Sequence, residues 1–123
     1  MMRFISGLAF ILLIGGGLPA AAQSDCQMPI APAAPDGKTS TQAQLMAAAG
    51  DARSFIAQSD VYQQCLADYV KAQRDLAIKN KTPFDNSIQT DALKKISENQ
   101  DEKVKVGGDI NAAIGAFKAS HPQ

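Results

Sequence analysis

The chain of 123 residues has no tryptophan, one histidine and two cysteines, and its 12 basic residues balance its 12 acidic ones. The one histidine, His121, stands near the C-terminus, where it cannot by itself make a Cys/His or Ser/His/Asp grouping. The balanced charge argues against a nucleic-acid-binding protein, which would carry a basic patch or stripe. The sequence contains no P-loop, G-x-G-x-x-G or Cys/His metal spacing. We therefore expect no catalytic residues, no metal, no cofactor and no enzymatic activity.

What is present begins with the layout of a cleavable export signal in residues 1–22. Arg3 gives a short basic start, an apolar run follows, and small residues close the segment. Ala20 and Ala22 have the A-x-A spacing of a cleavage site, so we expect cleavage between Ala22 and Gln23. The apolar run is shorter than the roughly 18 to 20 residues that span a membrane. No stable membrane anchor is expected after cleavage.

A lipid-acceptor cysteine is the alternative, because Cys26 follows closely. Such a site needs small or aliphatic residues directly before the cysteine, and Gln23-Ser24-Asp25 stand there instead. We therefore expect a periplasmic or secreted protein. Removal of the signal takes away Arg3 and leaves a net charge near −1, which gives no attraction to nucleic acid or to anionic membranes.

Residues 23–39 are rich in proline and are predicted to form an extended strap. Pro29, Pro32 and Pro35 recur at every third residue, and Asp36-Gly37 follows them. Proline fixes φ, lacks an N–H donor and holds the preceding residue extended, so a polyproline-like segment ending in a turn is expected. SH3-type domains bind the same PxxP spacing. In a small exported protein we favour a strap that lies on its own chain.

From residue 40 to residue 80 the pattern predicts a long amphipathic helix. Thr39, Ser40 or Thr41 can cap its start, and Gln42 or Gln44 stands three residues beyond a cap candidate, as in a capping box. Apolar side chains then recur at helical spacing, as in a coiled coil. One heptad position holds Leu45, Ala52, Ser59, Leu66 and Gln73, and the position three residues later holds Ala48, Phe55, Tyr62, Tyr69 and Leu76.

A second helix is predicted over residues 85–119. Pro83 ends the first helix, and Asp85, Asn86 or Ser87 can cap the next. The glycines at 107 and 108 could break this helix, or they could mark a close approach in a continuous helix. We favour the continuous helix, because the apolar positions stay in phase across the glycines. The apolar stripe of this helix has few members over residues 99–103, so we expect poorer packing there. The stripe consists of Ile88, Leu93, Ile96, Val104, Val106, Ile110, Ala113, Ile114 and Phe117.

These patterns predict an all-α protein, a long antiparallel helical hairpin with helices over about 40–80 and 85–119. Helices joined by a short loop pack antiparallel. The expected organisation is a signal peptide over 1–22, a strap over 23–39 and a single hairpin domain over 40–120. With few aromatic side chains, the core should be thin.

Cys26 and Cys65 are predicted to form an intramolecular disulfide, because two cysteines in an exported protein normally pair. From residue 40 back to Cys26 an extended strap spans roughly 43 Å. From residue 40 forward to Cys65 a helix spans roughly 37 Å. The strap can therefore fold back along the first helix, and closing the loop is worth about 4 kcal/mol in the chain-entropy model. An intermolecular bridge or a redox pair is the alternative, although the spacing is not CxxC.

These expectations leave two classes of function. One is a structural or protein-interaction module whose long face binds a protein partner or a second copy. The other is a small periplasmic holdase-type chaperone that grips unfolded envelope proteins between helical arms. A holdase of that kind would carry strongly basic arms and an oligomerising β-body, and the sequence has neither. We therefore favour the interaction module.

The cysteines and their surroundings resemble a group of small exported proteobacterial proteins of uncharacterised function. The resemblance covers most of the chain after the signal and implies a periplasmic, all-helical protein with a continuous second helix. It implies no catalytic residue and no ligand. The residues that carry it are Cys26, Pro29, Pro32, Pro35, Asp36 and Gly37, then Phe55, Asp60, Tyr62, Cys65 and Leu66, and finally Gly107 and Asn111-Ala112-Ala113.

Overall fold

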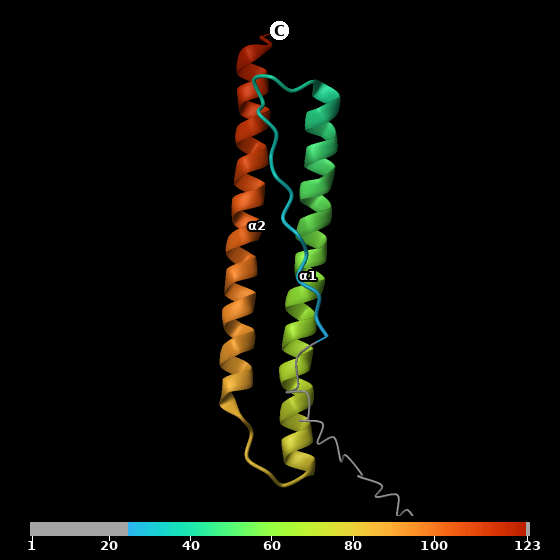
Figure 1. The fold of residues 1–123 in the computed structure, drawn as a ribbon, viewed down its shortest axis with the longest axis vertical. Helices are drawn as coiled ribbons and strands as arrows, with labels where there is room; N and C mark the ends of the chain where they lie inside the picture. The colour runs from blue at the N-terminus through green and yellow to red at the C-terminus, as the bar shows by residue number, and fades with distance from the viewer. Residues whose placement is uncertain (1–24, 123) are drawn as a thin grey trace, which may run out of the picture.

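The computed structural model describes residues 25–122, so the expected cleavage site at Ala22 and Gln23 lies outside the described residues. The described part holds two helices, α1 (Gln42–Lys79) and α2 (Asn86–Ser120). They lie side by side and run antiparallel, joined by a short loop at one end (Figure 1). The predicted all-α helical hairpin is confirmed. Among residues 25–122 we find no helix with the length and apolar character needed to cross a membrane.

The ends of α1 are set by local hydrogen bonds that the sequence encodes. Thr41 is the N-cap, its Oγ1 accepts from the Gln44 N–H, and the Gln44 side chain accepts from the Thr41 N–H, which is a complete capping box. At the other end Lys81 adopts a positive φ of 54°. The N–H groups of Lys81 and Thr82 donate back to Ile78 and Ala77, which satisfies carbonyls that the helix leaves free.

Helix α2 begins at a cap of the predicted type and continues without a break. The Asp85 carboxylate accepts from the Ser87 N–H at 2.9 Å. The helix runs through Gly107 and Gly108, so the predicted continuity is confirmed. A β-carbon at either glycine would meet nothing within 4 Å, so no close approach within the described structure requires them.

The core lies along the seam between the helices as two separate apolar clusters. The first contains Phe55 and Ala52 of α1 with Val106 and Ile110 of α2. The second lies nearer the loop and consists of Tyr62, Leu66 and Ala92, with Cys26, Val70 and Ile96 packed against it. Small and large side chains alternate along the seam, which brings the helices together but encloses little volume.

A buried polar layer separates the two clusters. Asn99 and Ser59 are both fully buried, and the Asn99 amide donates to Ser59 Oγ at 3.1 Å. Gln63 donates in turn to Asn99 Oδ1 at 2.9 Å. The expectation of poor packing around residue 99 is therefore wrong, because this region is filled by side chains that satisfy one another's hydrogen bonds.

For two residues of α2, the predicted place in the apolar seam is also wrong. Leu93 and Val104 are exposed. The seam instead follows a seven-residue spacing that begins one position earlier, at Ala92, and continues through Asn99, Val106 and Ala113. A polar residue in phase with the seam is buried there, while two large apolar residues out of phase are left in water.

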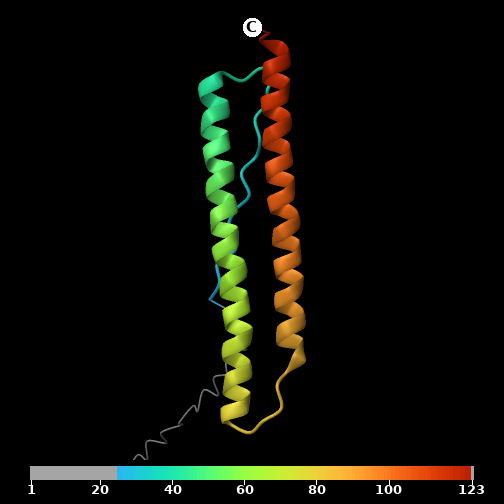
Figure 2. The same ribbon diagram turned by 180° about the vertical axis from the view of Figure 1, so that it is seen from behind.

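Residues 25–40 are without helix or strand and lie along one face of the hairpin (Figure 1). Seen from behind, the same segment passes on the far side of the helices (Figure 2). We call residues 25–35 the strap. It leads into a turn in which the Asp36 carbonyl accepts from the N–H groups of Thr39 and Ser40. Gly37 of this turn is buried, and a β-carbon there would lie 1.9 Å from the Ala113 carbonyl oxygen.

Replacement of Gly37 by alanine should therefore push the turn off α2. Overpacking of this kind typically costs about 1 to 3 kcal/mol, so we expect a lower free energy of unfolding in urea titrations. Gly50→Ala is the matched control, because its β-carbon would meet nothing within 4 Å. That change should stabilise the helix by up to about 1 kcal/mol. Equal effects of the two substitutions would contradict the close approach.

The polar layer gives a second prediction. Asn99→Ala leaves the Ser59 hydroxyl and the Gln63 amide with fewer partners in a buried site, so it should lower the free energy of unfolding by about 1 to 3 kcal/mol. Asn111→Ala is the matched control, because it makes the same change at an exposed position of α2 outside the layer. We expect a change within about 0.5 kcal/mol for that variant. Chemical denaturation of both proteins checks this, and an unaffected Asn99→Ala would show that the layer contributes nothing.

The cap of α2 predicts a pH dependence. The hydroxyl and the backbone N–H of Ser87 lower the pKa of Asp85 from its ordinary value of 3.8. A lowered folded-state pKa stabilises the protein above 3.8, and the stabilisation is lost as the pH falls through the folded-state value. Asp85→Ala should thus lower the Tm at neutral pH and have a smaller effect in strong acid. Asp85→Asn is the control, because asparagine can cap the helix but does not titrate. A loss of Tm in Asp85→Ala that is the same at neutral and acid pH would contradict the role given to the Asp85 carboxylate.

Candidate interaction surface beside the disulfide

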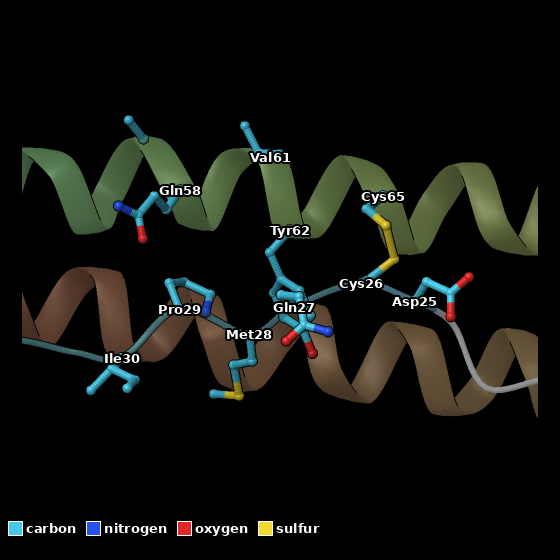
Figure 3. Close-up of a pocket in the computed structure, with 11 residues that line it drawn as sticks. Asp25, Cys26, Gln27, Met28, Pro29, Ile30, Gln58, Val61, Tyr62 and Cys65 are labelled. Atoms are coloured by element: carbon cyan, nitrogen blue, oxygen red, sulfur yellow. A yellow bond between two sulfur atoms is a disulfide. The ribbon is translucent and has the colours of Figure 1, made fainter.

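The two predicted cysteines are joined. Cys26 and Cys65 form a disulfide with a Cα–Cα distance of 5.7 Å across 39 positions of sequence, and no free cysteine stands among residues 25–122. The bond fixes the start of the strap to the middle of α1 (Figure 3). Cys26 packs against the second apolar cluster, which contains Tyr62 and Leu66. The bond therefore joins the strap to the second apolar cluster rather than to a remote part of the surface.

The strap faces the hairpin at every third residue. Cys26 and the three predicted prolines, Pro29, Pro32 and Pro35, are half-buried, and every other residue from 25 to 36 is exposed. A polyproline II helix has three residues per turn, so one residue in three points to the same side. The prolines consequently turn toward the protein, and the exposed residues between Cys26 and Pro35 are Gln27, Met28, Ile30, Ala31, Ala33 and Ala34.

An open groove of about 790 Å³ lies where the strap crosses α1. Met28 and Ile30 project from the strap on the side away from α1, while Val61 points away from the strap on the opposite side (Figure 3). Met28 is 50% exposed, Val61 70% and Ile30 93%. Within residues 25–122, an isoleucine so exposed gains little from packing, because its apolar surface stays in water.

The other side of the disulfide is acidic. A second groove is lined by Asp25, Asp60 and Asp68 together with both cysteines. Asp68 accepts a hydrogen bond from the Gln64 amide at 2.9 Å, and Asp60 forms an ion pair with Lys103 of α2. We call the two grooves together the bridge face, which comprises Met28, Ile30, Ala57 and Val61 with the acidic residues Asp25, Asp60 and Asp68.

The remaining candidate groups of the sequence are not brought together. His121 stacks on Phe117 with ring centroids 4.2 Å apart, and its Nδ1 lies 3.0 Å from the Phe117 carbonyl oxygen at the end of α2. Within residues 25–122 no group of three or more His, Cys, Asp or Glu side chains is placed to hold a metal ion. The bridge face is thus assembled from apolar and acidic side chains.

Sequence reasoning identified the cysteines and the prolines of this surface but not its exposed members. Val61 lies between two positions of the apolar stripe, and nothing in the sequence marks it as part of a surface. Ile30 is one of several residues that lie between prolines. The three-residue period was the available signal, because it places residues 27, 30 and 33 on one side once the prolines are known to face inward.

Comparisons of the chain with models of known protein families, with curated proteins and with solved structures gave no match. What the protein does has to be inferred from its own residues.

Proposed function

We propose that this protein is exported and acts outside the cytoplasm as a non-enzymatic interaction module that binds another protein through the bridge face. The Cys26–Cys65 disulfide supports export, because such bonds persist in oxidising compartments and are rare in the cytosol. The layout of residues 1–22 supports it independently, since it matches a cleavable signal with its cut after Ala22.

In this proposal the strap is a polyproline-like brace that presents a surface. The half-burial of Pro29, Pro32 and Pro35 supports this, because prolines turned inward are not available to an SH3-type domain. The brace is fixed at one end by the disulfide and at the other by the turn at Gly37. A surface held at both ends loses little conformational freedom on binding, which favours affinity.

The single observation that carries the proposal is the exposure of Ile30 and its neighbours on this braced segment. From Cys26 to Pro35 the strap contains no charged residue, and its outward side chains are mostly apolar. Scattered apolar residues on a surface need no explanation, but a group of them held on a tethered strap marks a site of protein contact.

The charges of the bridge face define the chemistry of its partner. Asp25, Asp60 and Asp68 are the charged residues that line the two grooves, and Asp60 is already paired with Lys103 of α2. A complementary partner therefore carries apolar side chains next to Lys or Arg. A second copy fits less well, because an isologous contact would enclose two copies each of Asp25 and Asp68, for which the bridge face offers no basic residue.

The export part of the proposal predicts a specific mature form. Intact mass spectrometry of the protein from the native envelope fraction, without reductant, should give a chain that begins at Gln23 and is lighter by two hydrogens than the thiol form. A chain that retains residues 1–22, a lipid adduct or two free thiols would contradict export with cleavage and internal pairing.

The binding part is tested with a photo-reactive amino acid placed at position 30 in cells that express the full chain. We expect irradiation to give one discrete adduct, because Ile30 stands in the apolar half of the bridge face. The same amino acid at Leu93 is the control, since Leu93 is also an exposed apolar residue but lies on α2 away from the bridge face. The partner is then purified for direct binding measurements.

Ile30→Asp should weaken binding of that partner by about 10- to 100-fold, the equivalent of burying one large aliphatic side chain. Leu93→Asp should leave the Kd unchanged, and added salt should raise the Kd because the acidic rim contributes. Many different adducts at position 30 would favour a holdase, and an adduct between two copies would favour self-association. Either result, or equal loss of binding in both variants, would overturn the proposal.

A further inference from the structure

We propose that the Cys26–Cys65 disulfide is a redox latch, whose reduction releases the strap from the hairpin while α1 and α2 remain paired. This inference concerns the strap alone and stands whether or not the bridge face binds a partner. It rests on how the strap is held, on one carboxylate beneath it and on the access to the sulfur atoms.

Apart from its covalent bond, the strap is held to the hairpin only weakly. Among the described residues, no hydrogen bond involves the backbone or side chains of residues 25–35. The non-covalent hold consists of Cys26 against the second apolar cluster and the half-buried faces of three prolines. The hydrogen bonds begin only in the turn, where the Asp36 carbonyl accepts from Ser40 at 3.0 Å.

The closed strap also lies over a group that prefers water. Glu102 of α2 lines the groove between α2 and residues 31–37, together with Lys105 and Val106. Its Oε2 atom is buried and has no hydrogen-bond partner among residues 25–122. A buried acceptor without a partner opposes the structure that buries it, because its hydration is lost and nothing replaces it. Release of the strap returns water to this oxygen.

The disulfide shifts this balance through effective concentration. With the bond intact, the strap cannot leave the seam, so weak contacts are enough to order it. With the bond broken, residues 25–35 are joined covalently to the hairpin only through the turn, where Gly37 lies close against Ala113. The turn is therefore the hinge, and the strap is the arm that the bond holds closed.

Both cysteines are half-buried and border open grooves. Cys26 and Cys65 line both grooves of the bridge face, so an incoming thiolate has an approach from either side. Asp25 and Asp68 border one approach and disfavour small anionic thiols. The geometry fits a neutral dithiol or the dithiol site of a thiol–disulfide oxidoreductase.

Reduction of the bridge proceeds by two successive thiol–disulfide exchanges. One thiolate of the dithiol attacks a sulfur of the bridge, the Cys26–Cys65 bond breaks, and the released cysteine sulfur takes a proton. The second thiol of the dithiol, as thiolate, then attacks the mixed disulfide and frees the other cysteine, which is also protonated. The bridge gains two electrons and two protons, and the dithiol is oxidised to its own disulfide.

The test uses the chain over residues 23–123 with ¹³C-methyl methionine, because Met28 on the strap and Met46 on α1 are the methionines of this part. Oxidised and dithiothreitol-reduced samples are compared by methyl NMR and circular dichroism. We expect the Met28 methyl line to narrow by about twofold or more on reduction, as for a segment that becomes mobile. The Met46 line and the helical circular dichroism should be unchanged at low temperature.

Three variants sharpen the test. The Cys26→Ser/Cys65→Ser double variant should show the mobile Met28 signal without reductant. Glu102→Ala should broaden the Met28 line again in the reduced protein, because closing the strap no longer buries an unpaired carboxylate oxygen. Glu98→Ala is its control, since that carboxylate is exposed and pairs with Lys94 on the surface of α2.

Two results would overturn the latch. A Met28 signal that does not change on reduction would show that the strap stays closed without the bond. A loss of helical circular dichroism on reduction would show that the bond holds the entire fold, so that no separate release of the strap exists. A Glu102→Ala variant no different from Glu98→Ala would remove the role given to the buried carboxylate.

Discussion

The seam between α1 and α2 has two open edges, and the rest of the structure follows from that constraint. Two helices can bury a stripe of side chains against each other, but they cannot surround it. Here the seam is narrow and holds many small residues, among them Ala52, Ala92 and Ala113. A third element along one edge is the simplest way to enlarge the core, and the strap lies on that edge (Figure 1).

The middle of the seam is specified by polarity rather than by apolar packing. Asn99 meets Ser59 and Gln63 between the two apolar clusters. If one helix slid along the other by a turn, Asn99 would lie against apolar side chains and lose its partners. A buried amide thus fixes the register of two long helices, which the alanine-rich stripe alone would leave loosely defined. The cross-helix ion pair of Asp60 with Lys103 stands beside this layer and favours the same alignment.

Much of the fold could be predicted because it depends on local rules. Thr41 with Gln44, Pro83, and Asp85 set the helix ends within a residue or two of the expected bounds. The disulfide could be predicted from the rise per residue of two kinds of backbone, since the strap and α1 cover similar lengths from residue 40.

The details of the seam and of the bridge face could not be predicted in the same way. Leu93 and Val104 were assigned to the seam because they are hydrophobic, although they are out of phase with its seven-residue spacing. Asn99 is in phase with that spacing but is polar. The exposure of Ile30 depends on which third of the strap turns inward, and that is decided by the contact with the helices rather than by the strap itself.

The inward turn of the prolines explains why a proline-rich segment suits this position. An extended chain that crosses helices leaves backbone N–H groups without intrachain partners, and proline removes that donor at three of the four points where the strap is half-buried, Cys26 being the fourth. The other N–H groups of the strap belong to exposed residues. The segment therefore covers the edge of the seam without burying an unpaired donor at those positions, while its outward residues are free of the packing that fixes the inner ones. A strap built this way is stiff, weakly held and dependent on its one covalent bond, and those properties make the Cys26–Cys65 disulfide the control point of the structure.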